Sequence, residues 1–189
     1  MSGTEDLYKL PDNLPVPVDD GACDHLPGMR LPAVQLPSTG GGRVDLSALP
    51  GRTVVYCYPR TGDPAKKRSV GWNEIPGARG CTPQSCAFRD HFEEIKTLGA
   101  GVLGLSAQPA DQQREARDRL HLPFELLSDA ELAFAGALRL PVFEFGGMTL
   151  LKRLTLILRD GGIEKVFYPV FPPDRNAGEV IAWLSGNKI

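Results

Sequence analysis

Apolar residues along this chain gather in short runs that glycine, proline and charged residues separate. The run over residues 53–58 is β-branched and aromatic, with glycine and proline close to its two ends. A continuous apolar run of this length predicts a strand that is buried on both faces and central in a sheet. A second short apolar run, over residues 102–106, predicts a neighbouring strand.

A long helix is predicted from Thr82 and Pro83 to a stop at Gly99. Threonine is a good cap before the helix, and proline is favoured in the first helical turn. The apolar residues that follow recur at helical spacing, which supports one continuous helix. They are Phe88, Phe92, Ile95 and Leu98.

The rest of the pattern predicts alternating elements followed by a hairpin. Further helices are predicted over residues 110–120, from residue 128 onward and over residues 177–184, and further strands over residues 43–46, 124–127, 150–158 and 163–168. The last two strands flank the turn Asp160-Gly161-Gly162. The order βαβα followed by ββα favours a thioredoxin-like α/β fold, with a central mixed β-sheet flanked by helices.

The length of 189 residues predicts one domain with extensions. Residues 1–30 hold scattered prolines and little periodicity, which predicts an extended proline-rich arm. Residues 31–189 are predicted to form the thioredoxin-like domain. Within it, residues 60–80 are rich in glycine, proline and charge, and predict a long structured loop of a kind that is often functional.

Composition narrows the class of protein. Hydrophobic residues are 42% and charged residues 23%, which is typical of a soluble folded chain. The net charge of −2 gives no broad positive field, so neither nucleic acid nor a membrane surface is an expected partner. No apolar stretch approaches the ~20 residues of a membrane span. The polar, acidic N-terminus lacks the order of a signal peptide, so a cytoplasmic location is expected.

Four cysteines are too few for a disulfide scaffold, and they indicate thiol chemistry, metal binding or plain burial. Cys81 stands at the start of the predicted long helix, and Cys86 follows five residues later. Unpaired N–H groups and the positive end of the helix dipole favour a thiolate at Cys81, and a nearby arginine would favour it further. Cys81 is therefore the candidate nucleophile.

Other chemistries fit this pair less well. Zinc sites usually pair cysteines two to four residues apart and add a second pair or histidines. The thioredoxin redox motif has two intervening residues, whereas this chain has four. Burial as a small hydrophobic residue stays open for both cysteines, and for Cys86 it weighs as much as a chemical role. Neither a metal nor another cofactor is expected.

Two segments resemble the peroxidatic region of the peroxiredoxins. They are Tyr-Cys-Tyr-Pro at residues 56–59 and Gly-Cys-Thr-Pro-Gln-Ser-Cys-Ala-Phe-Arg-Asp at residues 80–90. The resemblance is greatest to the Q type, also called bacterioferritin comigratory protein, whose two cysteines lie five residues apart on one helix. Residues 102–106, 124–129 and 153–162 match later segments of the family, so the resemblance extends over roughly residues 26–186.

The resemblance implies a thiol-dependent peroxidase for hydrogen peroxide and small alkyl hydroperoxides. It implies that Cys81 is the peroxidatic cysteine, Cys86 the resolving cysteine and Arg153 the active-site arginine, while Gln84 matches a residue that helps to order the pocket. The implied disulfide between Cys81 and Cys86 would be reduced by a thioredoxin- or glutaredoxin-like protein. A monomer or weak dimer is expected.

The implied disulfide sets a geometric requirement. Two positions five residues apart on a regular helix have Cα atoms about 8.6 Å apart. A disulfide spans at most about 7 Å between Cα atoms. The first helical turn is therefore expected to unwind when Cys81 and Cys86 join.

The chain departs from the family pattern before Cys81. Proline usually stands seven residues before the peroxidatic cysteine, and threonine or serine three residues before it, but this chain has Glu74 and Ala78. The natural interpretation is an insertion at residues 60–80, with Pro59 keeping its place at the end of the strand. Thr61 is then the candidate for the missing hydroxyl, which otherwise has no substitute.

Other residues have two interpretations each. Cys57 is expected to be a buried, inert thiol, and Cys23 is either an ordinary thiol or, with His25, a fragment of a metal site. His91 is either a solvated helix residue or the base of a Cys-His hydrolase, and Trp72 either anchors the loop or covers the site. The same cysteine pair would also serve a thiol-disulfide oxidoreductase or a redox-sensing binding protein.

Overall fold

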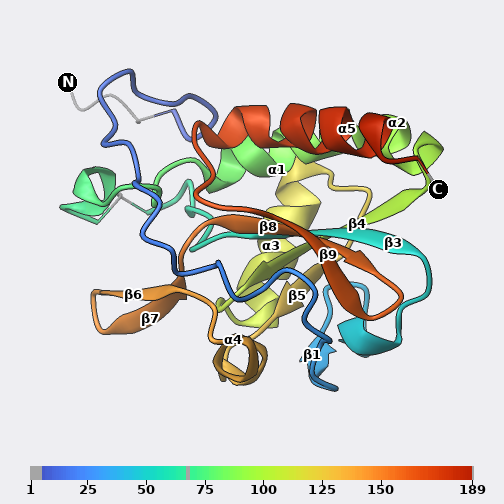
Figure 1. Ribbon diagram of the computed structural model, residues 1–189. Coiled ribbons are helices and arrows are strands. Elements are labelled where there is room, and N and C mark those ends of the chain that lie inside the picture. The colour runs from blue at the N-terminus through green and yellow to red at the C-terminus, as the bar shows by residue number, and fades with distance from the viewer. Residues whose placement is uncertain (1–5, 67–68, 189) are drawn as a thin grey trace.

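The computed structural model describes residues 6–66 and 69–188. Its centre is a five-stranded sheet in the order β5-β4-β3-β8-β9 (Figure 1). The strands are β3 (Arg52–Cys57), β4 (Ala100–Ser106), β5 (Leu126–Ser128), β8 (Leu154–Arg159) and β9 (Gly162–Phe167). All six residues of β3 are buried, as its continuous apolar run predicts.

The pairing makes this a mixed sheet. β3 pairs with β4, and β4 with β5, in parallel, whereas β3 with β8 and β8 with β9 are antiparallel. Parallel neighbours need crossover connections, which the helices after β3 and β4 provide. The thioredoxin-like α/β fold with a central mixed sheet and a closing hairpin is thus confirmed.

Helices cover both faces of the sheet (Figure 1). They are α1 (Cys81–Asp90), α2 (Phe92–Thr97), α3 (Ala110–Leu120), α4 (Ala133–Leu138) and α5 (Asn176–Gly186), with 3-10 turns η1 (Leu46–Ala48), η2 (Trp72–Glu74) and η3 (Pro173–Arg175). Alternate residues of β3 serve two cores, because successive side chains of a strand point to opposite faces. Tyr56 packs in one core with Phe88 of α1, and Val55 packs in the other with Phe134 of α4.

Two predicted elements are wrong in extent. The predicted single helix ending at Gly99 is two helices, since His91 ends α1 and precedes α2. The sequence conceals this break because helical periodicity continues across it. The single strand over residues 150–158 is two strands, β7 (Met148–Leu151) and β8. Lys152 and Arg153 lie between them, and the chain changes its partner strand there.

Two strands, β1 (Gln35–Pro37) and β6 (Val142–Phe145), were not predicted, and one helix begins late. β1 pairs with β2 (Arg43–Asp45), and β6 forms a hairpin with β7. The helix expected from residue 128 begins as α4 at residue 133. Asp129 accepts hydrogen bonds from the backbone N–H groups of Phe134 and Ala135, so it caps that helix.

The N-terminal segment crosses the molecule before the first strand. Over residues 6–34 it contains no helix or strand, and residues 1–5 of the predicted arm lie outside the described residues. At Arg30 it forms a bridge to Gly162 of β9, and Ser38 forms a bridge to Leu127 of β5. Among the described residues, no helix has the length and apolar character needed to cross a bilayer.

Candidate active site

Cys81 is the first residue of α1, and its side chain is only 4% exposed. Gly80 caps the helix in a left-handed conformation, with φ 110° and ψ 20°. The Sγ atom of Cys81 lies 3.1 Å from Nη2 of Arg153 and 3.8 Å from the carbonyl oxygen of Ala78. The sulfur thus meets the fixed positive charge of Arg153 at the N-terminal end of a helix.

Arg153 is held by backbone carbonyls on the side of the sulfur. Its Nε donates to the carbonyl of Gly77 at 3.1 Å, and its Nη2 to that of Ala78 at 3.1 Å. Nη1 donates to Oε1 of Gln84. The guanidinium is 3% exposed, so its contact with Cys81 is little screened by water. The structure therefore brings together three of the residues that the sequence singled out.

Two further residues support Gln84. Its Nε2 donates to Oδ1 of Asn176 at 3.1 Å, and the Thr155 hydroxyl donates to the same atom at 2.7 Å. All three side chains are fully buried. Sequence reasoning missed both partners, although Thr155 stands two residues after Arg153 and so shares its face of extended chain. Asn176, on α5, gave no signal.

Pro59 and Thr61 lie on the loop after β3. The carbonyl of Pro59 accepts a hydrogen bond from Ser106 at 3.0 Å. The Thr61 hydroxyl donates to Oε1 of Gln108 at 3.2 Å, and the Thr61 amide donates to the same oxygen at 2.8 Å. Within the described chain, Thr61 makes no hydrogen bond to Cys81 or Arg153.

Ala78 belongs to a small apolar cluster with Trp72 and Leu150. Trp72 is 8% exposed, and its ring packs edge-on against Phe145 of the β6–β7 hairpin with ring centroids 5.1 Å apart. The guanidinium of Arg60 lies 5.7 Å from the tryptophan ring centre. Through these contacts Trp72 anchors the loop to the β6–β7 hairpin. Ala78 lies in the same apolar cluster, so its methyl group suits its surroundings.

Cys86 lies on the same helix as Cys81 and is half-buried. Burial raises the pKa of its thiol, an effect that the nearby Arg89 partly opposes. Both thiols are free, and α1 is continuous from one to the other. His91, at the end of this helix, is partly exposed and bonds Glu94 at 3.0 Å.

Cys23 and Cys57 belong to the other core, on the opposite face of the sheet from Cys81. Burial raises the pKa of Cys23 to about 12, and raises the pKa of Cys57 as well. His25 beside Cys23 bonds the backbone carbonyl of Leu138. No group of three metal-ligating side chains occurs in the described ranges.

The N-terminal arm lies against the start of α1. The Arg79 side chain donates to the carbonyls of Asp6 and Lys9 at 2.8 and 2.9 Å. Leu10 and Pro173 crowd the space beside Gly80, where an added Cβ would lie 2.8 Å from Leu10 and 2.7 Å from Pro173. The arm thus packs against Arg79 and Gly80, the two residues before Cys81.

Gly80→Ala is expected to lower the free energy of unfolding by about 1–3 kcal/mol, because the new side chain meets Pro173 at a positive φ. Thermal unfolding followed by circular dichroism measures the change. Gly178→Ala, in α5 with open space around the site, is the matched control and is expected to be neutral or stabilising. Equal melting temperatures for Gly80→Ala and the wild type would contradict this account of the cap.

Comparison with known proteins identifies the family of this chain. The Redoxin family matches residues 26–181. Peroxiredoxin Q from the chloroplast of Sedum lineare is 32% identical over 163 residues, which cover 85% of this chain and 78% of that protein. The peroxiredoxin Q of Oryza sativa subsp. japonica is 35% identical, and the chain spans 65% of its length.

Solved structures give the same result. Peroxidoxin BcpB from Mycobacterium tuberculosis superimposes with a TM-score of 0.70 at 25% identity, over 87% of this chain and 100% of that one. Xanthomonas campestris peroxiredoxin Q superimposes with a TM-score of 0.65 at 25% identity, over 84% and 96% of the two chains. The chain belongs to the Redoxin family and, within it, to the Q-type peroxiredoxins.

Proposed function

We propose that the protein is a thiol-dependent peroxidase that reduces hydrogen peroxide and alkyl hydroperoxides. The observation that carries the proposal is the 3.1 Å contact between Nη2 of Arg153 and the sulfur of Cys81. The carbonyls of Gly77 and Ala78 accept hydrogen bonds from the same guanidinium and fix it beside the sulfur. A donor held in this way stabilises charge without having to reorganise during the reaction.

The first step transfers one oxygen atom to sulfur. The Cys81 thiolate attacks the terminal oxygen of ROOH, an S–O bond forms, and the O–O bond breaks. The departing RO⁻ takes a proton and leaves as alcohol, or as water when the substrate is hydrogen peroxide. Arg153 stabilises the negative charge as it moves from sulfur to oxygen, and Cys81 becomes a sulfenic acid.

The second step joins Cys81 to Cys86. The Cys86 sulfur attacks the sulfenic sulfur, an S–S bond forms and water leaves. Both cysteines lie on the regular helix α1, where Cα atoms five residues apart are separated by about 8.6 Å. The first turn of α1 therefore has to unwind. Cys23 lies on the other face of the sheet, which makes it a poor substitute.

The other residues are assigned positioning roles. Gln84 orients Arg153, and Asn176 fixes Gln84. Pro59 shapes the loop after β3. Thr61 is already bonded to Gln108, so supplying the hydroxyl that is absent at Ala78 would require it to exchange that partner.

A dithiol protein of the thioredoxin or glutaredoxin type is the proposed reductant, and exchange with its two thiols returns Cys81 and Cys86 to the reduced state. Such a cycle suits a reducing compartment such as the cytoplasm. A monomer or weak dimer is proposed.

A coupled assay tests the proposed function. Peroxide consumption is followed with thioredoxin, thioredoxin reductase and NADPH, while dimedone traps the sulfenic acid for peptide mass spectrometry. The expected result is continuous turnover with the dimedone adduct on Cys81. Disulfide exchange without peroxide consumption would instead indicate a thiol-disulfide oxidoreductase, and a single slow oxidation would indicate a redox sensor.

Formation of the disulfide is expected to become faster as pH rises. Burial raises the pKa of Cys86, with Asp90 adding to the rise and Arg89 and Arg119 opposing it. The thiol is thus mostly protonated at neutral pH, and below its pKa the reactive thiolate increases about tenfold per pH unit. Stopped-flow tryptophan fluorescence after one equivalent of hydrogen peroxide measures this second phase. A second phase with the same rate from about pH 6 to pH 9 would contradict the assignment.

A further inference from the structure

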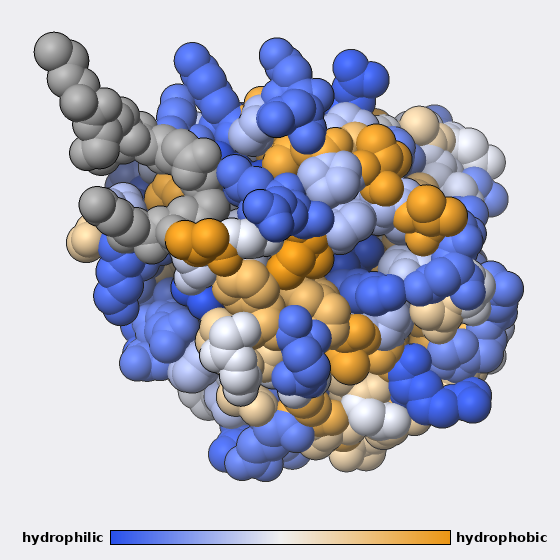
Figure 2. Space-filling view, turned by 90° about the vertical axis from the view of Figure 1, so that its left-hand side faces the viewer, coloured by the Kyte–Doolittle hydropathy of each residue, from blue (hydrophilic) through white to orange (hydrophobic). Residues whose placement is uncertain are grey.

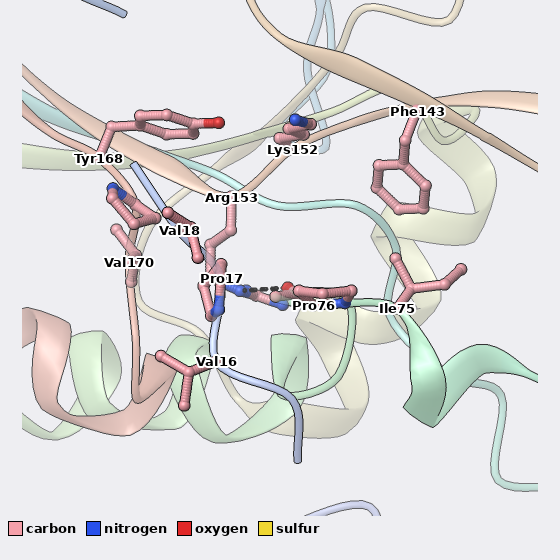
Figure 3. A pocket seen from close by; sticks show the side chains of 12 residues that line it. Val16, Pro17, Val18, Ile75, Pro76, Phe143, Lys152, Arg153, Tyr168 and Val170 are labelled. Atoms are coloured by element: carbon pink, nitrogen blue, oxygen red, sulfur yellow. Dashed lines mark hydrogen bonds between the residues drawn. The ribbon is translucent and has the colours of Figure 1, made fainter. Parts of the chain in front are cut away.

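A cavity of about 300 Å³ lies beside Arg153 (Figure 3). Three separate segments wall it: residues 16–18 of the N-terminal arm, residues 75–77 of the long loop, and residues 168–170 after β9. Phe143 of the β6–β7 hairpin adds an aromatic ring. Its volume falls at the lower end of the range for small-molecule sites.

The walls of this cavity are largely apolar. Val16, Val18, Ile75, Pro76, Phe143 and Val170 contribute aliphatic or aromatic groups. The polar side chains at the rim are engaged with the arm, since Lys152 and Tyr168 both bond Asp20, at 2.9 and 2.8 Å. The cavity thus offers apolar contact for a hydrocarbon group.

The outer surface around the cavity is also apolar. Figure 2 views the side of the molecule that carries the arm and the β6–β7 hairpin, and hydrophobic residues gather near the centre of that side. Val16 and Val18 are 64% and 80% exposed. Large apolar side chains exposed beside a cavity are typical of ligand-binding surfaces.

One side chain connects the cavity with the reacting sulfur. Arg153 lines the cavity, and its Nη2 lies 3.1 Å from the sulfur of Cys81. In Figure 3 the dashed line from Arg153 marks its Nε hydrogen bond to Gly77, which is itself a lining residue. A molecule in the cavity therefore lies next to the guanidinium that would stabilise the departing oxygen.

We propose that this cavity binds the apolar R group of an organic hydroperoxide ROOH while its peroxide group reacts at Cys81. The inference rests on the proposed peroxidase function and adds a selectivity to it. Hydrogen peroxide has no R group and gains nothing from the cavity. An aryl or branched alkyl hydroperoxide gains binding energy when it leaves water for the apolar walls.

Part of the cavity wall lies outside the segment that the Redoxin family matches. The Redoxin match begins at residue 26, so Val16 and Val18 lie outside it. Ile75 and Pro76 belong to the stretch between Pro59 and Cys81 that is interpreted as an insertion. The arm and the loop thus supply much of the apolar surface that a substrate would contact.

The test measures two substrates on the wild-type protein and on a double variant at the edge of the cavity. In Val16→Ser/Val18→Ser, the ratio of kcat/KM for cumene hydroperoxide to kcat/KM for hydrogen peroxide is expected to fall about tenfold, the scale on which apolar pocket contacts discriminate. Both positions are exposed, so the fold tolerates the change. Val70→Ser is the matched control, because Val70 is a valine that is 98% exposed on the loop carrying Ile75 and does not line the cavity.

A binding measurement supplies the second readout. 2-Phenyl-2-propanol, the alcohol that cumene hydroperoxide leaves, is titrated into the wild-type protein and the double variant by isothermal calorimetry. The expected result is saturable binding that weakens about tenfold in the double variant. An unchanged substrate ratio, or equal affinity of both proteins for the alcohol, would overturn the cavity assignment. If the wild-type protein consumes neither peroxide, that result would overturn the proposed function instead.

Discussion

Cys81→Ser is expected to reduce peroxide turnover by at least about 10⁴-fold, the scale on which loss of a nucleophile acts in other enzymes. Serine preserves the size of the side chain and its place beside Arg153. Its hydroxyl does not ionise at neutral pH, so no anion is available to attack the O–O bond. The coupled peroxide assay measures the loss, and circular dichroism confirms that the fold persists.

The matched control for this variant is Cys86→Ser. It keeps the nucleophile and is expected to complete the first oxidation at the wild-type rate. It should then stop, or proceed to the sulfinic acid, because no thiol protects the sulfenic acid. Peroxide turnover by Cys81→Ser at more than a few per cent of the wild-type rate would contradict the assignment of the nucleophile. Normal cycling of Cys86→Ser with thioredoxin would contradict the assignment of Cys86 as the resolving thiol.

Arg153→Lys is expected to slow formation of the sulfenic acid by about 100- to 1000-fold, the usual cost of losing one aligned donor to a developing oxyanion. Lysine keeps the positive charge but has no planar fork. It therefore cannot bond the carbonyls of Gly77 and Ala78 while it also contacts the Cys81 sulfur. Single-turnover oxidation by hydrogen peroxide, followed by fluorescence, measures the rate.

Arg159→Lys is the matched control, because Arg159 ends the strand that follows Arg153 and is 44% exposed beside Asp160. It is expected to react at the wild-type rate. A wild-type rate in Arg153→Lys would show that positive charge alone suffices. Equal slowing in both variants would indicate a general effect on the strand rather than a role at the sulfur.

The central sheet could be predicted because its signals are local. β3 is buried on both faces, and burial of that kind requires a continuous apolar run that the sequence displays. The β6–β7 hairpin was missed for the opposite reason. The residues of β6 alternate between exposed and half-buried positions, and the glycines at 146 and 147 form a turn that the pattern did not single out.

The site was predictable to the extent that it depends on one segment of chain. Cys81 at the start of a helix is a short-range feature, and Arg153 came only from the resemblance to peroxiredoxins. The bonds that fix Gln84 through Asn176 join residues 92 positions apart, and no periodicity records such a pairing. The cavity was equally hidden, because its walls come from segments that meet only in the folded chain.

The N-terminal segment has a further consequence for how the molecule behaves in concentrated solution. Arg30 bridges to Gly162 on the outer edge of β9, and Ser38 bridges to Leu127 on the outer edge of β5. These two strands are the ends of the five-stranded sheet, where unpaired backbone groups otherwise recruit strands from other molecules. The stretch from Arg30 to Ser38 thus pairs with both edges at one position each, and it opposes the open-ended strand pairing from which insoluble fibrils grow.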